Sequence, residues 1–550
     1  MILADWSWTI CRLGPGPPLS ARSSDLMTSG YVPDPALKNQ PFSRQQWLVI
    51  LAVTLLAALL RMLELGEWSF WIDEAHTWRD ATMPLAGDSG FMSTDRRMYS
   101  LPFFLLRFLF GVGALGFDEW SVRLPFALIG IATVPLLAVC GRRLVGPWPA
   151  VFAACLLAVS PWHIFWSQNA RGYVMVVLGS VLLMHRLHVL LQTGRARDLL
   201  LSGLFAAFAM GSHATAATLV LAFVGFLVVR SANRTRFGGL TVVVLALLLA
   251  GPVPWLVKHY GLFAKFFEAK SNTSPLHWFE TVVYYFRPSL LLTVLLAMLA
   301  APRLLGRTRA LYLGCMLVVP MFALTAVGSQ LAKVTARYAI CTLPAAMLLA
   351  GFLIAVVTRR IGQLPGLSKS RRWLLAGVLP ALVVGDFLQL DVAYFTQQHG
   401  QRGQWRAASQ FVREQAQERG RSGARVLSVN HPTMLYYLRP RHWFVGDQDP
   451  HPEMDVSAVL FWRFSKGEDN DENKLHEPGV EAHFQWHLKR AARNDQMFAV
   501  VITLPALREK DKTGQFEAVL KRDFELALYL PTWVGPKDES IYVYLPRRTE

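Results

Sequence analysis

The chain has 550 residues, of which 53% are hydrophobic and only 17% are charged. Soluble globular domains contain about 25% charged residues, so this composition excludes an ordinary soluble protein and predicts several membrane spans. The formal net charge is +17 at pH 7, and most of the surplus lies in short linkers between apolar runs, as the positive-inside rule requires. We therefore expect a lipid bilayer as a partner and no nucleic acid.

Residues 1–45 precede the first apolar run and lack the apolar core of a signal peptide. The proline-, serine- and arginine-rich sequence around residues 15–24 is typical of a disordered segment. We predict that residues 1–45 form a disordered cytoplasmic tail. Translation from Met27 instead of Met1 is an alternative that N-terminal sequencing of the native protein would decide.

Apolar runs of about the length needed to cross a bilayer, roughly 17–25 residues, recur between residues 46 and 390. We predict about eleven transmembrane helices in this membrane domain. The two runs separated only by Gly211-Ser212-His213 are short for spans. The predicted spans lie at about residues 46–64, 121–140, 148–163, 173–191, 199–211, 214–230, 240–257, 288–304, 310–328, 339–357 and 373–390.

Arginine-rich linkers alternate with other linkers along this domain. The linkers on one side carry clusters such as Arg142 and Arg143, and only one acid, Asp198, offsets them. Because basic residues concentrate on the cytoplasmic side, the N-terminus is predicted to lie inside, and the first outer loop (residues 65–120) and the C-terminal region outside. We predict a multi-pass protein of the inner (plasma) membrane.

The apolar segment at residues 99–112 is predicted not to cross the membrane. It is only about 14 residues long, and Arg107 lies in its middle. Counting it as a span would place the later arginine-rich linkers outside. We interpret it as an amphipathic helix that lies in the outer interface.

Beyond residue 390, charged and apolar residues mix as in soluble proteins. Residues 404–419 show helical periodicity and a second helix begins near residue 434, whereas several shorter runs have the pattern of strands. We predict a small extracytoplasmic α/β domain over residues 391–550. Its predicted strands lie at residues 425–429, 498–503, 525–530 and 540–545.

An acidic pair, Asp73 and Glu74, lies among aromatic residues directly after the first span. Aromatic side chains favour the membrane interface, and acids at that depth are costly unless they have a function. The pair is therefore a candidate catalytic site. The alternative is that the two acids cap a helix and face solvent.

Five short motifs follow one another in an order that resembles a known family. They are W-x-D-E at residues 71–74, R-L-P at 123–125, S-P-x5-S-Q-x-A-R-x-Y at 160–173, R-Y at 337–338 and W-R-A-A at 405–408. The order resembles bacterial relatives of the dolichyl-phosphate-mannose–protein mannosyltransferases and of the lipid A aminoarabinose transferases, which are GT-C glycosyltransferases. The resemblance covers about residues 46–440.

This resemblance implies a polytopic α-helical membrane protein of GT-C type, with interfacial helices in the first outer loop. It also implies a polyprenyl-phosphate-linked sugar as donor and an active site at the outer leaflet. The chain departs from the family near residues 98–102, where relatives often have His-Pro-Pro and this sequence reads Met-Tyr-Ser-Leu-Pro. The sequence leaves open which sugar is transferred and whether the acceptor is a protein, a glycan or a lipid.

Glycosyl transfer from a lipid phosphate requires a carboxylate that takes the proton of the acceptor hydroxyl. By resemblance and by position, Asp73 is predicted to be this base, and Glu74 to orient the acceptor, Asp73 or a cation. One acid beside one lipid-linked donor favours a single displacement with inversion over a covalent intermediate.

The departing phosphate requires cations, because negative charge accumulates on it in the transition state. Arg171 and Arg337 lie at outer ends of spans, and the planar guanidinium group suits phosphate oxygens. We predict that both bind the donor phosphate, together with Gln168 and Tyr173 of the motifs. Alternatively, each arginine only reaches lipid headgroups.

Four further residues are weaker candidates: Asp95, His76, His213 and Tyr338. A salt bridge with neighbouring arginines explains Asp95 equally well, and a structural hydrogen bond explains His213. His76 lies close to Asp73, but Asp73, Glu74 and His76 in one loop do not by themselves define a metal site. We assign no metal ligands and no certain cofactor, and a divalent metal stays an alternative.

Two other functions compete with glycosyl transfer. A transporter or flippase of a lipid-linked substrate usually contains repeated halves and ionisable residues at mid-membrane, and this sequence shows no repeat. One acid, Asp386, does lie inside the last predicted span and should pair with another residue. A non-catalytic binding protein is the third alternative, and replacement of Asp73 would distinguish it from an enzyme.

Overall fold

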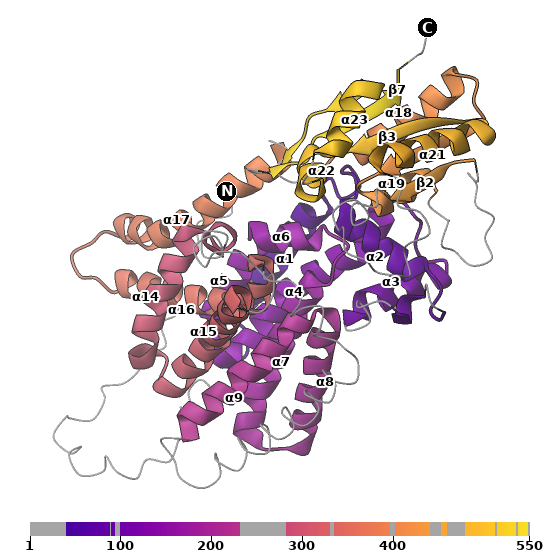
Figure 1. Ribbon diagram of the computed structural model, residues 1–550. Coiled ribbons are helices and arrows are strands. Elements are labelled where there is room, and N and C mark those ends of the chain that lie inside the picture. The colour runs from indigo at the N-terminus through magenta and orange to yellow at the C-terminus, as the bar shows by residue number, and fades with distance from the viewer. Residues whose placement is uncertain are drawn as a thin grey trace, which may run out of the picture. The chain divides into compact units, whose positions relative to one another are not determined.

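Apolar helices and a small mixed sheet make up the two parts of this protein (Figure 1). The computed structural model describes residues 40–87, 90–93, 99–231, 282–330, 335–396, 402–439, 453–458, 479–511, 514–534 and 537–547. Nearly all of the predicted tail, the predicted span at 240–257 and the candidate residue Asp95 lie outside the described residues.

The helical part contains the long apolar helices that the sequence predicts. Each predicted span other than 240–257 coincides with a helix. These helices are α1 (Arg44–Met62), α4 (Glu119–Val145), α5 (Pro147–Ala158), α6 (Pro161–Ser167), α7 (Tyr173–Thr193), α8 (Ala196–Ser212), α9 (Ala217–Ser231), α14 (Pro288–Leu304), α15 (Arg307–Gln330), α16 (Leu343–Gly362) and α17 (Lys369–Thr396).

Within the described ranges, six helices are long and apolar enough to cross a membrane, or seven if α5 and α6 are one bent span. The number is lower than the predicted eleven because α8, α9 and α14 have only 17, 15 and 17 residues and because the predicted span at 240–257 lies outside the described residues. The polytopic helical class is confirmed, and the chain is a multi-pass membrane protein.

A bend of 62° separates α5 from α6 inside one predicted span. Pro161 begins α6, and the preceding Ser160 is extended, with φ −75° and ψ 116°. A proline disfavours the helical conformation in the residue before it, so the Ser-Pro pair ends α5. The bend directs the segment after α6, residues 168–172, toward the first outer loop.

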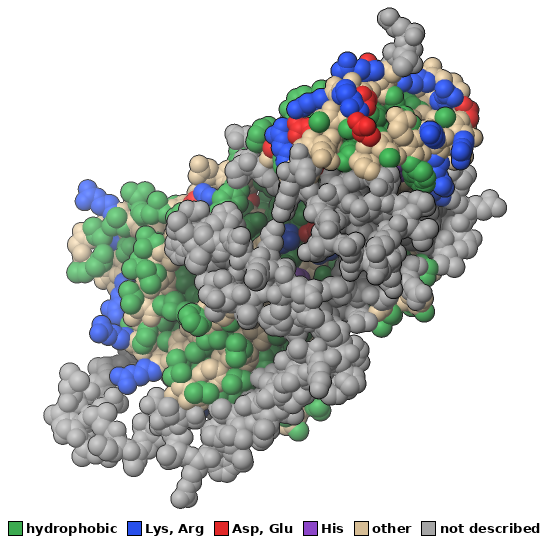
Figure 2. Space-filling model, viewed as in Figure 1, with side chains coloured by type: hydrophobic (Ala, Val, Ile, Leu, Met, Phe, Trp, Pro, Cys, Tyr) green, Lys and Arg blue, Asp and Glu red, His purple; other side chains and the backbone are tan. Residues whose placement is uncertain are grey.

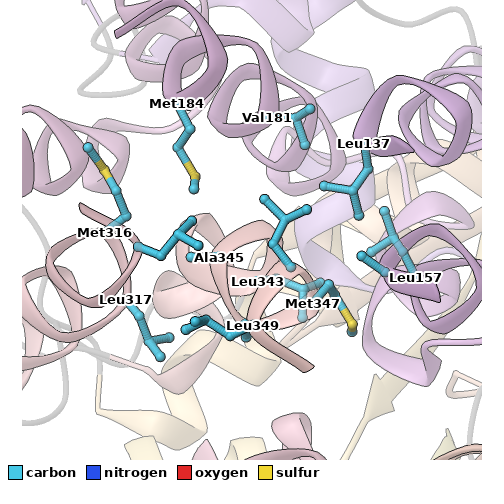
Figure 3. Packing of buried hydrophobic residues seen from close by; sticks show 14 of the residues in the cluster. Leu137, Leu157, Val181, Met184, Met316, Leu317, Leu343, Ala345, Met347 and Leu349 are labelled. Atoms are coloured by element: carbon cyan, nitrogen blue, oxygen red, sulfur yellow. The ribbon is translucent and has the colours of Figure 1, made fainter. Parts of the chain in front are cut away.

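The main hydrophobic core lies between α4, α5, α7, α15 and α16 (Figure 3). Helix α16 runs through its centre and packs against α5 over most of its length. Gly351 makes this close approach possible, because a Cβ atom there would lie 2.4 Å from the Pro149 carbonyl oxygen and 2.6 Å from the Ala153 nitrogen. Small residues at such contacts let helix backbones approach in a membrane.

The acid in the last span has the partner that the sequence could not identify. Asp386 on α17 accepts hydrogen bonds from Arg287, with Nη2 2.5 Å from Oδ1, and from the Ser289 hydroxyl at 2.5 Å. Arg287 and Ser289 flank the start of α14. The acid therefore joins α17 to α14.

The first outer loop contains two short helices, α2 (Ile72–Thr82) and α3 (Leu101–Gly111), and one turn of 3-10 helix at Phe91–Ser93. Helix α3 confirms the helix expected at residues 99–112. Its Arg107 donates hydrogen bonds to the carbonyl oxygens of Asp80 and Met83, at 3.2 and 2.5 Å. Arg107 thus satisfies carbonyl groups at the end of α2, which a helix leaves unpaired.

The C-terminal part is the predicted α/β domain, with one five-stranded sheet in the order β2-β1-β3-β7-β4. Strand β1 is parallel to β2 and β3, and β7 is antiparallel to β3 and β4. Its elements are α18 (Trp405–Glu418), β1 (Gly423–Ser428), α19 (His431–Leu438), β2 (Asp455–Ala458), α21 (Val480–Arg493), β3 (Gln496–Ile502), α22 (Leu504–Lys510), α23 (Gln515–Asp523), β4 (Phe524–Leu530), β5 (Trp533–Val534), β6 (Lys537–Asp538) and β7 (Ile541–Pro546).

Both faces of this sheet are covered. Helices α18 and α19 pack on one face, and α21, α22 and α23 pack on the other. Charged side chains gather on the surface of this domain, whereas hydrophobic side chains cover much of the visible helical part (Figure 2). The sequence predicted α18, α19, β1, β3, β4 and β7, but it missed β2, β5, β6, α21, α22 and α23.

We expect Gly351→Ala to lower stability, because the added methyl group overlaps the backbone of α5. Overpacking of this kind costs about 1–3 kcal/mol. The measurement is the thermal unfolding midpoint of the purified protein in detergent. Gly385→Ala on α17 is the control, because a Cβ atom there meets nothing within 4 Å. An unchanged midpoint for Gly351→Ala would contradict the close contact of α5 and α16.

Candidate functional site

Asp73 and Glu74 lie in the first turn of α2, which begins at Ile72, directly after Trp71. Carboxylates at this end of a helix interact favourably with the helix dipole. Because an α-helix has 3.6 residues per turn, successive side chains point in directions about 100° apart. The two acids therefore face different surroundings.

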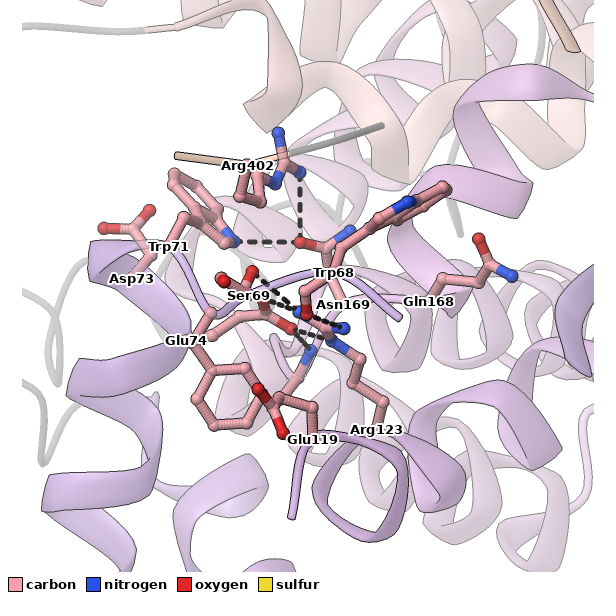
Figure 4. Close-up of polar contacts among 12 residues, drawn as sticks. Trp68, Ser69, Trp71, Asp73, Glu74, Glu119, Arg123, Gln168, Asn169 and Arg402 are labelled. Atoms are coloured by element: carbon pink, nitrogen blue, oxygen red, sulfur yellow. Dashed lines mark hydrogen bonds and ion pairs between the residues drawn. The ribbon is translucent and has the colours of Figure 1, made fainter. Parts of the chain in front are cut away.

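Glu74 forms a buried ion pair with Arg123 of α4 (Figure 4). Arg123 Nε donates to Oε1 and Nη2 donates to Oε2, both at 2.8 Å. The Glu74 side chain is 0% exposed and that of Arg123 is 2% exposed. Oε1 also accepts the Ala170 backbone N–H at 2.9 Å. Glu74 thus joins α2 to α4 and to the segment after α6.

The same guanidinium group fixes the chain between α1 and α2. Arg123 Nη1 donates to the carbonyl oxygens of Leu65 and Trp68, at 3.0 and 2.8 Å. Nη2 donates to the Ser69 carbonyl oxygen at 3.2 Å. Buried backbone groups outside regular structure need such partners, so Arg123 holds the irregular segment that precedes the acids.

Asp73 faces a different and partly open environment. Its Oδ2 lies 3.2 Å from Nη1 of Arg337, and the two side chains are 22% and 25% exposed. The Arg337 guanidinium carbon lies 5.8–5.9 Å from the ring centres of Trp71, Tyr173 and Tyr338. A carboxylate and a guanidinium group therefore meet among aromatic rings.

Arg171 lies next to Asp73 but contacts its backbone. Its Nη1 donates to the Asp73 carbonyl oxygen at 3.2 Å and to the Thr77 hydroxyl oxygen at 3.0 Å. These bonds hold the first turn of α2. The structure brings Arg171 to the predicted site, with its hydrogen bonds directed at the helix that carries the acid.

His213 lies on the other side of these arginines, within an aromatic cluster. Its ring centre is 5.3 Å from that of Tyr99, 5.0 Å from that of Tyr173 and 4.9 Å from that of Tyr338. Burial and the positive charges of Arg171 and Arg337 lower the pKa of His213 to about 3. The imidazole is therefore neutral near pH 7, and it can exchange hydrogen bonds without adding positive charge.

Gln168 does not reach Asp73. Its side-chain amide donates to the carbonyl oxygens of Leu60, Arg61 and Leu63, at 3.3, 3.3 and 2.6 Å. Its Oε1 accepts the Tyr394 hydroxyl at 2.6 Å. Gln168 thus satisfies the free carbonyl groups at the end of α1 and joins them to α17, and it points away from Asp73 in Figure 4.

The remaining candidates do not form a metal site. His76 lies on α2, one turn after Asp73. Within the part of the chain that the structure describes, no group of three His, Cys, Asp or Glu residues could hold a metal ion. The described residues therefore provide no ligand set for a divalent metal.

Arg402, which the sequence did not single out, reaches the site from the segment before α18. Its guanidinium carbon lies 5.0 Å from the ring centre of Trp71 and 4.3 Å from that of Phe165. Its Nη2 donates to Asn169 Oδ1 at 3.2 Å, and Trp71 Nε1 donates to the same oxygen at 2.9 Å. Only the position of Arg402, three residues before the W-R-A-A motif, could have drawn attention to it.

Helix α19 of the α/β domain packs directly against α2. The Tyr437 hydroxyl donates to Glu119 Oε1 and accepts the Phe70 N–H, both at 2.7 Å. Tyr436 packs on Phe70 and Trp78, with ring centres 4.5 and 5.2 Å apart. The α/β domain therefore contacts the residues that precede and follow the acids.

Helix α18 adds a second contact to the same loop. Arg406 of the W-R-A-A motif pairs with Glu119 at 2.7 Å and donates to the Gly66 carbonyl oxygen at 2.8 Å. Its backbone N–H donates to the Ser69 hydroxyl at 3.2 Å. Glu119 thus accepts hydrogen bonds from both α18 and α19.

Comparisons with known proteins identify a similar family and similar folds. Residues 101–256 match the family model described as dolichyl-phosphate-mannose-protein mannosyltransferase. A crystal structure of ArnT from Cupriavidus metallidurans bound to undecaprenyl phosphate is similar, with a TM-score of 0.53 and 15% identity, over 91% of this chain and 98% of that chain. The fold is of GT-C type.

Archaeal oligosaccharyltransferase AglB from Archaeoglobus fulgidus, in complex with an inhibitory peptide and a dolichol-phosphate, is similar as well. Its TM-score is 0.54 and its identity 13%, over 91% of this chain and 74% of that chain. No curated protein matches the sequence. The resemblance to the GT-C mannosyltransferase-like and ArnT-like proteins, drawn from five short motifs, is confirmed.

Glu74→Gln should destabilise the protein strongly, because it leaves the buried charge of Arg123 without a counter-charge. Breaking a buried ion pair costs about 3–5 kcal/mol. We expect a lower thermal midpoint and a lower yield of folded protein. Glu481→Gln, which breaks the exposed ion pair with Arg522, is the control and should change the midpoint little. Equal losses for the two variants would contradict this explanation.

Tyr437→Phe should weaken the contact between the α/β domain and the first outer loop. It leaves Glu119 and the Phe70 N–H each without one hydrogen bond, at a cost of about 1–3 kcal/mol. Limited proteolysis of the purified protein should cut the first outer loop faster. Tyr544→Phe on β7, outside this contact, is the matched control, and equal cleavage rates for the two variants would refute the predicted role.

Proposed function

We propose that this protein transfers a monosaccharide from a polyprenyl-phosphate donor to a hydroxyl group of an acceptor. Asp73 acts as the general base. The observation that carries the proposal is the pair of Asp73 and Arg337, a carboxylate and a guanidinium group 3.2 Å apart that are both partly exposed. Such a pair offers the two groups that the transfer needs, one for the proton and one for the phosphate.

In this reaction the acceptor oxygen attacks the anomeric carbon as the bond from that carbon to the phosphate oxygen breaks. Asp73 takes the acceptor proton, and the negative charge moves onto the phosphate of the departing lipid. Arg337 offers N–H donors to that phosphate. A single displacement inverts the anomeric configuration.

The buried residues around α2 support this assignment of roles. Glu74 is occupied by Arg123 and by the Ala170 N–H, so we propose that it positions α2 and does not exchange protons. Arg171 holds the backbone of the same turn. Catalytic groups need such fixed support, because small displacements of the reacting atoms reduce the rate strongly.

Two similar structures support a polyprenyl phosphate as the lipid. The ArnT structure contains undecaprenyl phosphate, and the AglB structure contains a dolichol-phosphate together with an inhibitory peptide. We propose that the reaction takes place at the outer face of the inner (plasma) membrane, with the N-terminus cytoplasmic and the α/β domain outside. The distribution of arginine among the linkers supports this orientation.

Asp73→Asn should abolish transfer while the protein still folds, because asparagine has a similar shape but cannot take the acceptor proton. Loss of a general base typically lowers the rate about 10²–10⁴-fold. Purified protein is incubated with a panel of polyprenyl-phosphate sugars. The measured quantity is the free polyprenyl phosphate released, which mass spectrometry detects.

Glu67→Gln, an acid-to-amide change at an exposed position of the same loop, is the matched control for this experiment. The proposal expects release by the wild type and by Glu67→Gln with at least one donor. Equal release by the wild type and Asp73→Asn would refute the role of Asp73. A wild type inert with every donor, in detergent and in lipid, would refute the glycosyl transfer itself.

A further inference from the structure

Arg402 is a buried cation that lacks a counter-charge among the residues that the structure describes. Its side chain is 7% exposed, and it lies against the faces of Trp71 and Phe165. Among the described residues, no carboxylate lies within ion-pair distance of Arg402, and its one hydrogen bond goes to the neutral amide oxygen of Asn169. A charge removed from water without a counter-charge is costly.

The other arginines of this region differ from Arg402 in this respect. Arg123 pairs with Glu74, Arg337 with Asp73 and Arg406 with Glu119. Cation–π contacts with two rings offset part of the burial cost. They leave most of the five N–H donors of a guanidinium group available, so the environment of Arg402 is suited to an anion from outside the protein.

Arg402 and Arg337 converge on one side chain. Their guanidinium carbons lie 5.0 and 5.8 Å from the ring centre of Trp71. Both charges also act on Tyr285, whose pKa is raised by burial and lowered by these two arginines. Arg337 comes from the 3-10 helix at Ala336–Thr342 that precedes α16, and Arg402 from the α/β domain, so two parts of the chain bring cations to the neighbourhood of Asp73.

The position of Arg402 is fixed by the domain that carries it. The neighbouring Gly403 N–H donates to Glu539 at 3.4 Å, and a Cβ atom at Gly403 would lie 2.9 Å from the Glu539 carbonyl oxygen. The Gln404 side chain donates to Pro531 and Thr532 at 3.2 Å. The segment is thus tied to the end of the sheet, and Arg402 is held before any ligand binds.

We infer that Arg402 binds the phosphate group of the polyprenyl-phosphate substrate together with Arg337, so that the α/β domain supplies a residue of the donor site. This inference rests on the proposed function and assigns its phosphate contact. It gives the C-terminal domain a direct part in donor binding. In Figure 4 the Arg402 side chain lies beside the Trp71 ring.

The alternative is that Arg402 only packs between the two rings and supports Asn169. Replacement of Arg402 would then weaken the binding of any lipid at this place, with or without a phosphate. The informative quantity is therefore the preference for undecaprenyl phosphate over undecaprenol, which has the same lipid chain and no phosphate.

The experiment measures dissociation constants for three probes, undecaprenyl phosphate, undecaprenol and inorganic phosphate. It uses the full chain in nanodiscs of phosphatidylcholine, so that the bilayer adds no anionic lipid, and binding is read by native mass spectrometry. The variants are Arg402→Gln, Arg402→Lys and the matched control Arg419→Gln. Arg419 follows the C-terminal end of α18, about 20 Å along the helix from Arg402.

We expect Arg402→Gln to weaken undecaprenyl phosphate binding about ten- to a hundredfold, the loss of one or more charge-assisted hydrogen bonds. Undecaprenol binding should not change, and Arg419→Gln should behave like the wild type. Arg402→Lys keeps the charge without the planar fork and should lose less. If Arg402→Gln does not fold, Arg402→Lys carries the test, with an expected several-fold loss confined to undecaprenyl phosphate.

Three results would overturn the inference. An unchanged preference in the Arg402 variants would remove Arg402 from the phosphate site, and an equal loss for both lipids would assign it a packing role. Inorganic phosphate that binds as tightly as undecaprenyl phosphate would assign the site to a free phosphate instead of a lipid. A wild type with no preference for undecaprenyl phosphate would refute the proposed function itself, which separates the two failures.

Discussion

The buried ion pair of Glu74 and Arg123 determines how the first outer loop is held. A carboxylate and a guanidinium group removed from water remain there only if both are fully hydrogen-bonded. Here Arg123 also donates hydrogen bonds to the carbonyl oxygens of Leu65, Trp68 and Ser69. Glu74 also accepts one from the Ala170 N–H. One polar network thus joins α1, α2, α4 and the segment after α6, and it fixes the direction in which the neighbouring Asp73 points.

The α/β domain extends this support from the other side. Tyr437 and Arg406 reach Glu119 at the start of α4, and Tyr436 packs on Phe70 before α2 and on Trp78 within it. Arg402 adds a cation beside Trp71. In this account the soluble domain is part of the donor site, because its helices hold the loop and one of its residues faces the lipid phosphate.

The sequence predicted the elements of the fold better than the roles of single residues. Long apolar runs indicate membrane helices because burial in lipid depends on composition, and the strands β1, β3, β4 and β7 follow from their local pattern. The acid pair drew attention to the loop in which Asp73 meets Arg337. Adjacent residues on a helix face different surroundings, however. No local sequence pattern indicated that Glu74 is buried while Asp73 is partly exposed.

Long-range contacts explain the residues that sequence reasoning misjudged or missed. Gln168 belongs to a motif, yet its amide satisfies carbonyl groups at the end of α1, more than 100 residues earlier. Arg402 reaches Asn169 across 233 positions. The bend between α5 and α6, the partner of Asp386 and the strand β2 likewise depend on tertiary packing.

A structure of the full chain with undecaprenyl phosphate bound, determined by electron cryomicroscopy in nanodiscs, would test the central claim most directly. The account predicts that the phosphate group lies beside Trp71, within hydrogen-bond distance of Arg337 and Arg402, and that Asp73 faces the same space. A phosphate bound elsewhere, with Asp73 and Arg337 still paired and remote from it, would contradict the account.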